Sequence, residues 1–138
     1  MESKNIYPPL LIILFNRYAC SKKLISIINK KKFKKIYISI DGPRFQNTQD
    51  LIKINKIKKL ISNTKWNSKV ILLYRKKNLG CALNLYYSIK FFFNNENAGI
   101  VLEDDCIPIN NFFEFMRFNL TKYKDNKKIG AISGIDRR

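Results

Sequence analysis

Three acidic residues stand next to one another at Glu103, Asp104 and Asp105. They follow the apolar run 99–102 and come shortly before Pro108, a pattern typical of a short strand buried on both faces. Adjacent carboxylates repel one another unless a cation or hydrogen-bond donors reach them. Because ligands of open α/β sheets bind at the carboxyl ends of the strands, the cluster predicts a divalent metal site. The alternative is a solvated acidic turn between a strand and a helix.

Polar residues also follow each of three earlier apolar segments that the sequence predicts as strands. The carboxyl ends of parallel strands lie at one edge of a sheet, so we expect these side chains to converge with the acidic cluster. Carboxylates that hold a cation, beside bases that meet phosphates, would suit a metal–diphosphate ligand. The residues are Asn16 and Arg17 after segment 9–15, Asp41 and Arg44 after segment 36–40, and the basic loop 75–80 after segment 69–74.

Several of these residues also have a plainer interpretation. Asp41 precedes a Gly-Pro pair, a position typical of an Asx turn. Arg75 and the two lysines after it are equally well explained as a solvated loop. Asn78 begins a turn of the kind that leads into a helix, and the free N–H groups at such a helix start would also attract an anion.

Apolar residues recur at helical spacing between the predicted strands. Ser21 is expected to cap the first helix, Thr48 and Asp50 to open the second, and the lysines of 30–35 to form a solvated helix end. A fifth strand is expected at 129–134. The alternation predicts an α/β fold with a Rossmann-like, open and mostly parallel sheet, helices on both faces, and a single domain over residues 1–138. The helical stripes are 24–28, 51–61, 82–92 and 113–123.

The chain is strongly basic, with 27 Lys and Arg against 10 Asp and Glu and a formal net charge of +17. This charge suits a polyanionic partner, so the alternative function is a small nucleic-acid-binding protein. A third interpretation is a membrane-surface or partner-binding module that uses the lysines of 30–35. Nucleic acid is the less favoured partner, because the tyrosines stand on separate elements and do not form a stacking platform.

The residue types also limit the chemistry. The chain has no histidine, so a metal would be held by oxygen, which favours Mn²⁺ or Mg²⁺. Its 3 cysteines, widely spaced, predict neither a disulfide framework nor a zinc cluster. No apolar run is long enough to span a membrane, and segment 8–15 lacks the flanks of a signal peptide. We therefore expect a cytoplasmic protein, peripheral at most at the inner membrane face.

The strand ends carry a further set of motifs, although glycine-rich dinucleotide and Walker-type motifs are absent. In their order and spacing they resemble glycosyltransferases of the GT-A fold that use nucleotide-sugar donors. The likeness is greatest to the N-acetylglucosaminyltransferase I-like and bacterial family 2-like enzymes, and it covers roughly residues 9–134 as an N-terminal donor-binding half. The motifs are Phe-Asn-Arg at 15–17, Asp-Gly-Pro-Arg at 41–44, Arg-x-x-Asn-Leu-Gly at 75–80 and Glu-Asp-Asp at 103–105, before Pro108 and the aromatic run 112–115.

The resemblance implies glycosyl transfer from a UDP-sugar to a saccharide or lipid-linked acceptor, in polysaccharide biosynthesis. It implies that Asp105 coordinates Mn²⁺ or Mg²⁺ at the donor diphosphate and that Glu103 or Asp104 hydrogen-bonds the ribose. Asp41 would meet the nucleobase. The other donor-site residues that it implies are Asn16, Arg17, Arg75 and Asn78.

The chain departs from this pattern at its end. In an inverting enzyme of this kind the general base and the acceptor pocket lie in a C-terminal half, whereas the sequence stops at Arg138. No catalytic residue is therefore assigned. The expectation is a truncated enzyme whose single nucleotide-sugar-binding domain holds the donor without efficient transfer.

Overall fold

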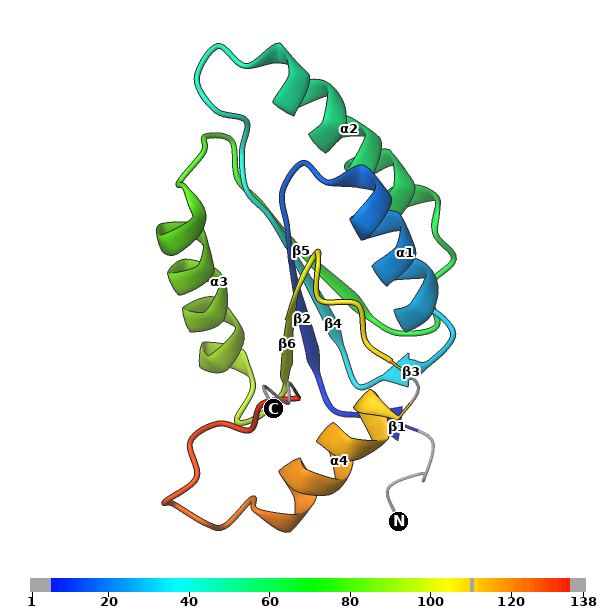
Figure 1. The fold of residues 1–138 in the computed structure, drawn as a ribbon, viewed down its shortest axis with the longest axis vertical. Helices are drawn as coiled ribbons and strands as arrows, with labels where there is room; N and C mark the ends of the chain where they lie inside the picture. Colours follow the sequence, from blue (N-terminus) through cyan, green and yellow to red (C-terminus); the bar gives the residue numbers. More distant parts are fainter. Residues whose placement is uncertain (1–5, 110, 135–138) are drawn as a thin grey trace.

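A four-stranded parallel sheet forms the centre of the computed structural model, which describes residues 6–109 and 111–134 (Figure 1). The strands lie in the order β5-β4-β2-β6, and Leu10 of β2 stands between Ile36 of β4 and Ile100 of β6. This arrangement confirms the predicted open, Rossmann-like α/β fold. The strand bounds are β2 Leu10–Leu14, β4 Ile36–Ile40, β5 Val70–Tyr74 and β6 Ile100–Glu103.

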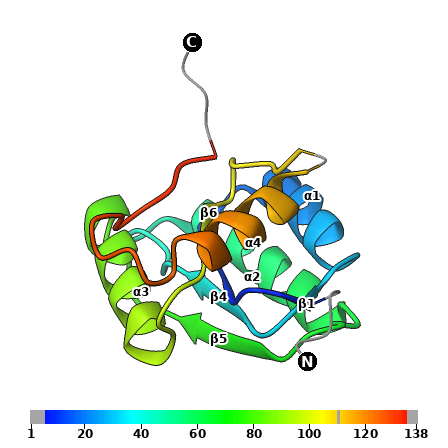
Figure 2. The same cartoon turned by 90° about the horizontal axis from the view of Figure 1, so that it is seen from below.

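Helices cover both faces of the sheet (Figure 2). Leu10, Ile12 and Leu14 of β2 pack on the side of α1 and α2, whereas Leu11 and Ile13 pack on the side of α3. A strand buried on both faces favours an unbroken apolar run, which explains why β2 shows no alternation in the sequence; β4 is buried on both faces as well, and its Ser39 hydroxyl is paired with that of Ser88. The helix bounds are α1 Tyr18–Ile28, α2 Thr48–Asn63, α3 Cys81–Asn95 and α4 Phe112–Lys122.

A second, small sheet was not expected from the sequence. It joins β1 (Ile6–Tyr7) to β3 (Lys32–Phe33) in parallel, and α4 packs against it through Phe113. The rings of Phe33 and Phe113 lie 5.2 Å apart between centroids, and Phe33 is only 2% exposed. The prediction of a solvated helix end at 30–35 is thus only partly right: Lys30, Lys32 and Lys34 are exposed, but α1 ends at Ile28 and Phe33 is buried in the core.

Ion pairs also occupy two of the lysines in that segment. Nζ of Lys35 lies 2.7 Å from Oε1 of Glu96, and Nζ of Lys31 lies 3.3 Å from Oε1 of Glu114. These pairs tie the segment to α4 and to the end of α3, which weakens the interpretation of 30–35 as a free membrane-binding cluster. None of the helices in the described ranges has the length and apolar character that a bilayer crossing requires.

Two local predictions need correction. The first helix begins at Tyr18, and Ser21 lies inside it, where its hydroxyl donates to the carbonyl of Arg17 at 2.9 Å. Leu51 is 47% exposed, so the buried stripe of α2 begins at Ile54. Such boundary differences arise because propensity alone does not fix where the tertiary contacts begin.

The expected strand at 129–134 is absent from the described structure. Residues 129–132 line a cavity of about 410 Å³ together with α4 and the start of β6. Side chains such as Met116 and Leu120 also line this cavity. The segment therefore lies beside α4 and the start of β6 but forms no ladder with the outer edge of β6.

Candidate functional site

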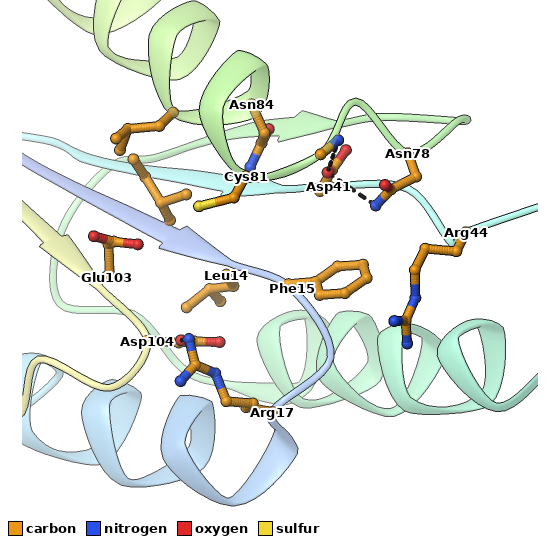
Figure 3. Close-up of a pocket in the computed structure, with 13 residues that line it drawn as sticks. Leu14, Phe15, Arg17, Asp41, Arg44, Asn78, Cys81, Asn84, Glu103 and Asp104 are labelled. Atoms are coloured by element: carbon orange, nitrogen blue, oxygen red, sulfur yellow. Dashed lines mark hydrogen bonds and ion pairs between the residues drawn. The ribbon is translucent and has the colours of Figure 1, made fainter. Parts of the chain in front are cut away.

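The carboxyl ends of the central strands meet at one edge of the sheet and enclose a pocket of about 290 Å³ (Figure 3). Its apolar wall is formed by Ile13, Leu14 and Leu85. This is the edge at which open α/β sheets bind ligands. Of the predicted site residues, Arg17, Asp41, Asn78, Glu103 and Asp104 line the pocket, whereas Asn16, Arg75 and Asp105 lie outside its lining.

The acidic cluster is held by Arg17 rather than grouped around open space. Nη2 of Arg17 lies 2.8 Å from Oδ1 of Asp104, and Nη1 lies 2.8 Å from Oδ2 of Asp105. The charge of Asp104 is the main cause that raises the pKa of Arg17. The single guanidinium therefore supplies the positive charge that adjacent carboxylates require.

One carboxylate oxygen of Asp104 takes no part in these ion pairs. The residue is 2% exposed, and its Oδ2 has no hydrogen-bond partner among the described residues. Burial raises the pKa of Asp104, and the nearby guanidinium of Arg17 opposes that shift. A buried carboxylate oxygen without a partner is costly, so it is a natural contact for a ligand that brings a donor.

The predicted metal ligand set does not fit an ion as the side chains are placed. Across 6–109 and 111–134, no group of three His, Cys, Asp or Glu side chains is arranged to hold a metal. Arg17 stands where a cation would have to stand. Binding of Mn²⁺ or Mg²⁺ at Asp105 therefore stays a prediction, and it requires displacement of this guanidinium.

Asp41 is buried and serves the protein's own backbone. Its carboxylate accepts hydrogen bonds from the backbone N–H groups of Gly42 at 2.9 Å, Leu79 at 2.9 Å and Gly80 at 3.2 Å, and from the amide of Asn78 at 3.0 Å. The Asx-turn interpretation is wrong, because that turn needs the N–H of the residue two positions on, which here is Pro43 and has none; the local part of its role is the bond from its neighbour Gly42. The larger part is a clamp that joins the loop after β4 to the loop after β5.

The two clamped loops lie in direct contact. A Cβ atom at Gly42 would lie 2.4 Å from the backbone carbon of Lys77, so only glycine permits this approach. Gly80 has a φ of +78°, which favours glycine at the start of α3. Asp41, Gly42 and Gly80 together fix the wall of the pocket that Asn78 lines.

Asp50 fixes the other side of the loop after β4. From the sequence, it was expected only to lie in the first turn of the second helix. Its oxygens accept from Nε and Nη2 of Arg44 at 2.6 and 2.9 Å and from Nδ2 of Asn16 at 2.7 Å. Its own N–H donates to the side chain of Asn47, the N-cap of α2. Hydrogen bonds from Arg44 are the main cause that holds the pKa of Asp50 well below its usual range. Asn16 and Arg44 are thus scaffold residues in this structure.

Polar residues on α3 complete the site and were missed in the sequence. Asn84 is buried, lines the pocket and accepts from Nε of Arg75 at 2.9 Å, which draws Arg75 onto α3. Ser88 lies one turn further on, and its hydroxyl is 2.7 Å from that of Ser39 on β4. Cys81 begins the helix and lines the pocket. The spacing 81, 84, 88 is a polar stripe within an otherwise apolar helix, a signal that could have been found.

Comparisons with known proteins add one functional lead. The chain is 32% identical over 115 residues to the malonyl CoA-acyl carrier protein transacylase of Buchnera aphidicola subsp. Baizongia pistaciae (strain Bp). The matched region covers 81% of this chain and 35% of that protein, so the chain spans about a third of the length of this curated relative. No family model and no solved structure matches the chain.

This similarity contradicts the resemblance to GT-A glycosyltransferases. The predictions of glycosyl transfer, of a nucleotide-sugar donor with a saccharide or lipid-linked acceptor, and of a place in polysaccharide biosynthesis are wrong on this finding. The nucleic-acid alternative gains no support. The physical reason is that strand-end acids, an Asp-Gly-Pro turn and a basic helix-entry loop are devices that any open parallel sheet can use to fix its carboxyl edge. Here Asp41, Asp50 and Arg17 serve that purpose.

Replacing Asp50 should make the free energy of unfolding depend less on pH under acidic conditions. Because the pKa of Asp50 is lower in the folded chain than in the unfolded chain, its contribution is present above the unfolded value and is lost as the pH falls below it. We expect Asp50→Asn to lower the free energy of unfolding at pH 7 by about 1–3 kcal/mol. Below about pH 4, the free energy of unfolding should fall less steeply with pH in the variant than in the wild type.

Urea denaturation followed by circular dichroism at a series of pH values measures this effect. The matched control is Asp125→Asn, at an exposed acid, which should retain the wild-type profile. Equal stability of Asp50→Asn and wild type at pH 7 would contradict the role of Asp50 as a loop anchor.

Metal binding should depend on Arg17. We expect Mn²⁺ to bind the wild type weakly, because the ion must displace the guanidinium, and to bind Arg17→Met more tightly, because Asp104 and Asp105 are then uncompensated. The electron paramagnetic resonance signal of free Mn²⁺ during a titration measures both affinities. Lys56→Met removes an exposed charge on α2 as a control. The prediction fails if the double variant Arg17→Met, Asp105→Asn binds Mn²⁺ as tightly as Arg17→Met.

Proposed function

We propose that the pocket at the carboxyl edge binds the acyl end of a malonyl thioester, and that the chain takes part in acyl transfer between coenzyme A and an acyl carrier protein. The similarity over 81% of the chain to a protein of that name supports the proposal. Because the chain spans only about a third of that relative, the activity of the whole protein is part of the proposal. The pocket, rather than the name, supplies the physical argument.

The size and lining of the pocket suit the reactive end of a thioester. A volume of about 290 Å³ lies at the lower end of the range for small-molecule sites, so it admits an acyl group and its thioester but not a whole coenzyme A. Ile13, Leu14 and Leu85 form an apolar wall, and Asn84 adds a buried amide. Such a lining excludes water from a thioester while leaving polar groups to orient it.

Arg17 is the observation on which the proposal chiefly rests. Its side chain is half-exposed and lines the pocket, and its two ion pairs use one N–H each on Nη1 and Nη2. A guanidinium has five N–H donors, so donors remain for the free carboxylate of a malonyl group. A malonyl carboxylate can accept from these remaining donors, in competition with Asp104 and Asp105 for the same guanidinium.

The carboxylates of the pocket are the groups available to move a proton. Exchange of one thioester for another requires that the acceptor thiol lose a proton and that the released coenzyme A thiolate gain one. Glu103 and Asp104 line the pocket, and burial raises the pKa of Asp104 above its ordinary value. The chain has no histidine to take this role.

Cysteine footprinting tests whether malonyl-CoA enters the pocket. Cys81 is exposed and lines the pocket, whereas Cys106 is exposed and lies outside its lining, so the second thiol is an internal control. We expect malonyl-CoA to slow alkylation of Cys81 by iodoacetamide severalfold and in a saturable manner, because the bound acyl end covers the thiol. The rate at Cys106 should not change. Mass spectrometry of the two cysteine-containing peptides measures both rates.

Two comparisons sharpen this experiment. Cys81→Phe should fill the pocket and abolish binding of malonyl-CoA in calorimetry, whereas Leu83→Phe, at an exposed position on α3, should retain it. A UDP-sugar serves as the control ligand and should not protect Cys81. Equal alkylation with and without malonyl-CoA, or protection by the UDP-sugar instead, would overturn the proposed function.

A further inference from the structure

An exposed aromatic ring lies at the tip of the loop after β4, beside the pocket. Phe45 is 89% exposed, and the next residue, Gln46, has a φ of +54°. A phenyl ring left in water at the end of a loop contributes nothing to the core. This loop is nevertheless fixed, because Asp50 holds Arg44 on one side and Asp41 holds the neighbouring loop on the other. A rigid, exposed aromatic residue is the kind of anchor that dominates protein interfaces.

Two exposed lysines lie on the loop that is packed against this one. Lys76 and Lys77 follow Arg75, and neither forms an ion pair among the described residues. The close approach of Gly42 to the backbone of Lys77 shows that the two loops lie side by side. The loop that carries Phe45 and the loop that carries the two lysines are thus adjacent, and we name these three exposed residues the pocket rim. It combines an apolar anchor with uncompensated positive charge.

We propose that the pocket rim is the docking surface for an acidic acyl carrier protein. This inference rests on the proposed function. The pocket is too small for more than the acyl end of a carrier's thioester arm, so the body of the carrier must rest on the surface beside the pocket mouth. Positive charge on the rim complements an acidic domain and would steer its approach.

The distribution of charge around the pocket favours a small protein over a membrane. The rim lies on the side of β4 and β5, whereas Glu103, Asp104 and Asp105 lie at the end of β6 across the sheet. A flat anionic bilayer pressed against this edge would meet both sides and be repelled by the acids. A small acidic domain can occupy the basic side alone and extend its arm into the pocket.

Charge reversal on the rim tests the docking surface. We expect Lys76→Glu with Lys77→Glu to weaken binding of a malonyl-loaded acyl carrier protein by about tenfold or more, and Phe45→Ser to weaken it by a similar factor. The matched control is Lys56→Glu with Lys59→Glu, the same charge change on the exposed face of α2, which should alter affinity much less. Calorimetry measures each affinity at two salt concentrations.

A short thioester separates docking from pocket binding. Malonyl-N-acetylcysteamine lacks the carrier and the phosphates, so its protection of Cys81 should be the same in the wild type, the rim variants and the control. If Cys81 is protected but rim and control variants bind the carrier equally, the docking surface is wrong while the proposed function stands. If the wild type shows neither protection nor carrier binding, both are wrong. Loss of binding to anionic vesicles in the rim variants, with carrier binding intact, would assign the rim to a membrane and overturn the proposal.

Discussion

The carboxyl edge of this sheet depends on the buried carboxylate of Asp41. A carboxylate removed from water must be satisfied by donors, and here the donors are backbone N–H groups of the loop that leads into α3. The same contact that satisfies the charge therefore fixes the position of Gly80 and of the first turn of α3. Without it, the pocket would have no defined wall between β4 and α3. Asp50 acts in the same way on the other flank, through Arg44 and Asn16.

The acids around the pocket thus divide into two groups with different roles. Asp41 and Asp50 are fully used as loop anchors, and their hydrogen bonds leave little capacity for a ligand. Asp104 and Asp105 share one guanidinium that is itself half-exposed, and Asp104 keeps an oxygen without a partner among the described residues. The second group is the part of the site that a ligand can rearrange. Function at this edge therefore depends on the balance between Arg17 and the acidic cluster.

Periodicity in the sequence was enough to predict the central fold, because run 9–15 is apolar throughout and segment 36–40 is rich in β-branched and aromatic residues. It also brought the correct residues to one edge, since parallel strands leave no other place for residues that follow them. Contacts that depend on side-chain pairing were not predictable. Nothing in the spacing shows that Phe33 packs against Phe113, that Arg17 takes the place of a cation, or that segment 129–134 forms no strand.

The family assigned from motifs was wrong because those motifs describe the shape of the edge and not its ligand. The single domain and the cytoplasmic location stay predictions.

The central claim is that the carboxyl edge, and no other cavity of the fold, receives a malonyl thioester. Nuclear magnetic resonance of the ¹⁵N-labelled chain during titration with malonyl-CoA tests it most directly. We expect shifts at the backbone amides of Asn78, Gly80 and Cys81, which line the pocket, and no shifts at residues 129–132, which line the larger cavity beside α4. Shifts confined to 129–132, or none at saturating malonyl-CoA, would contradict it.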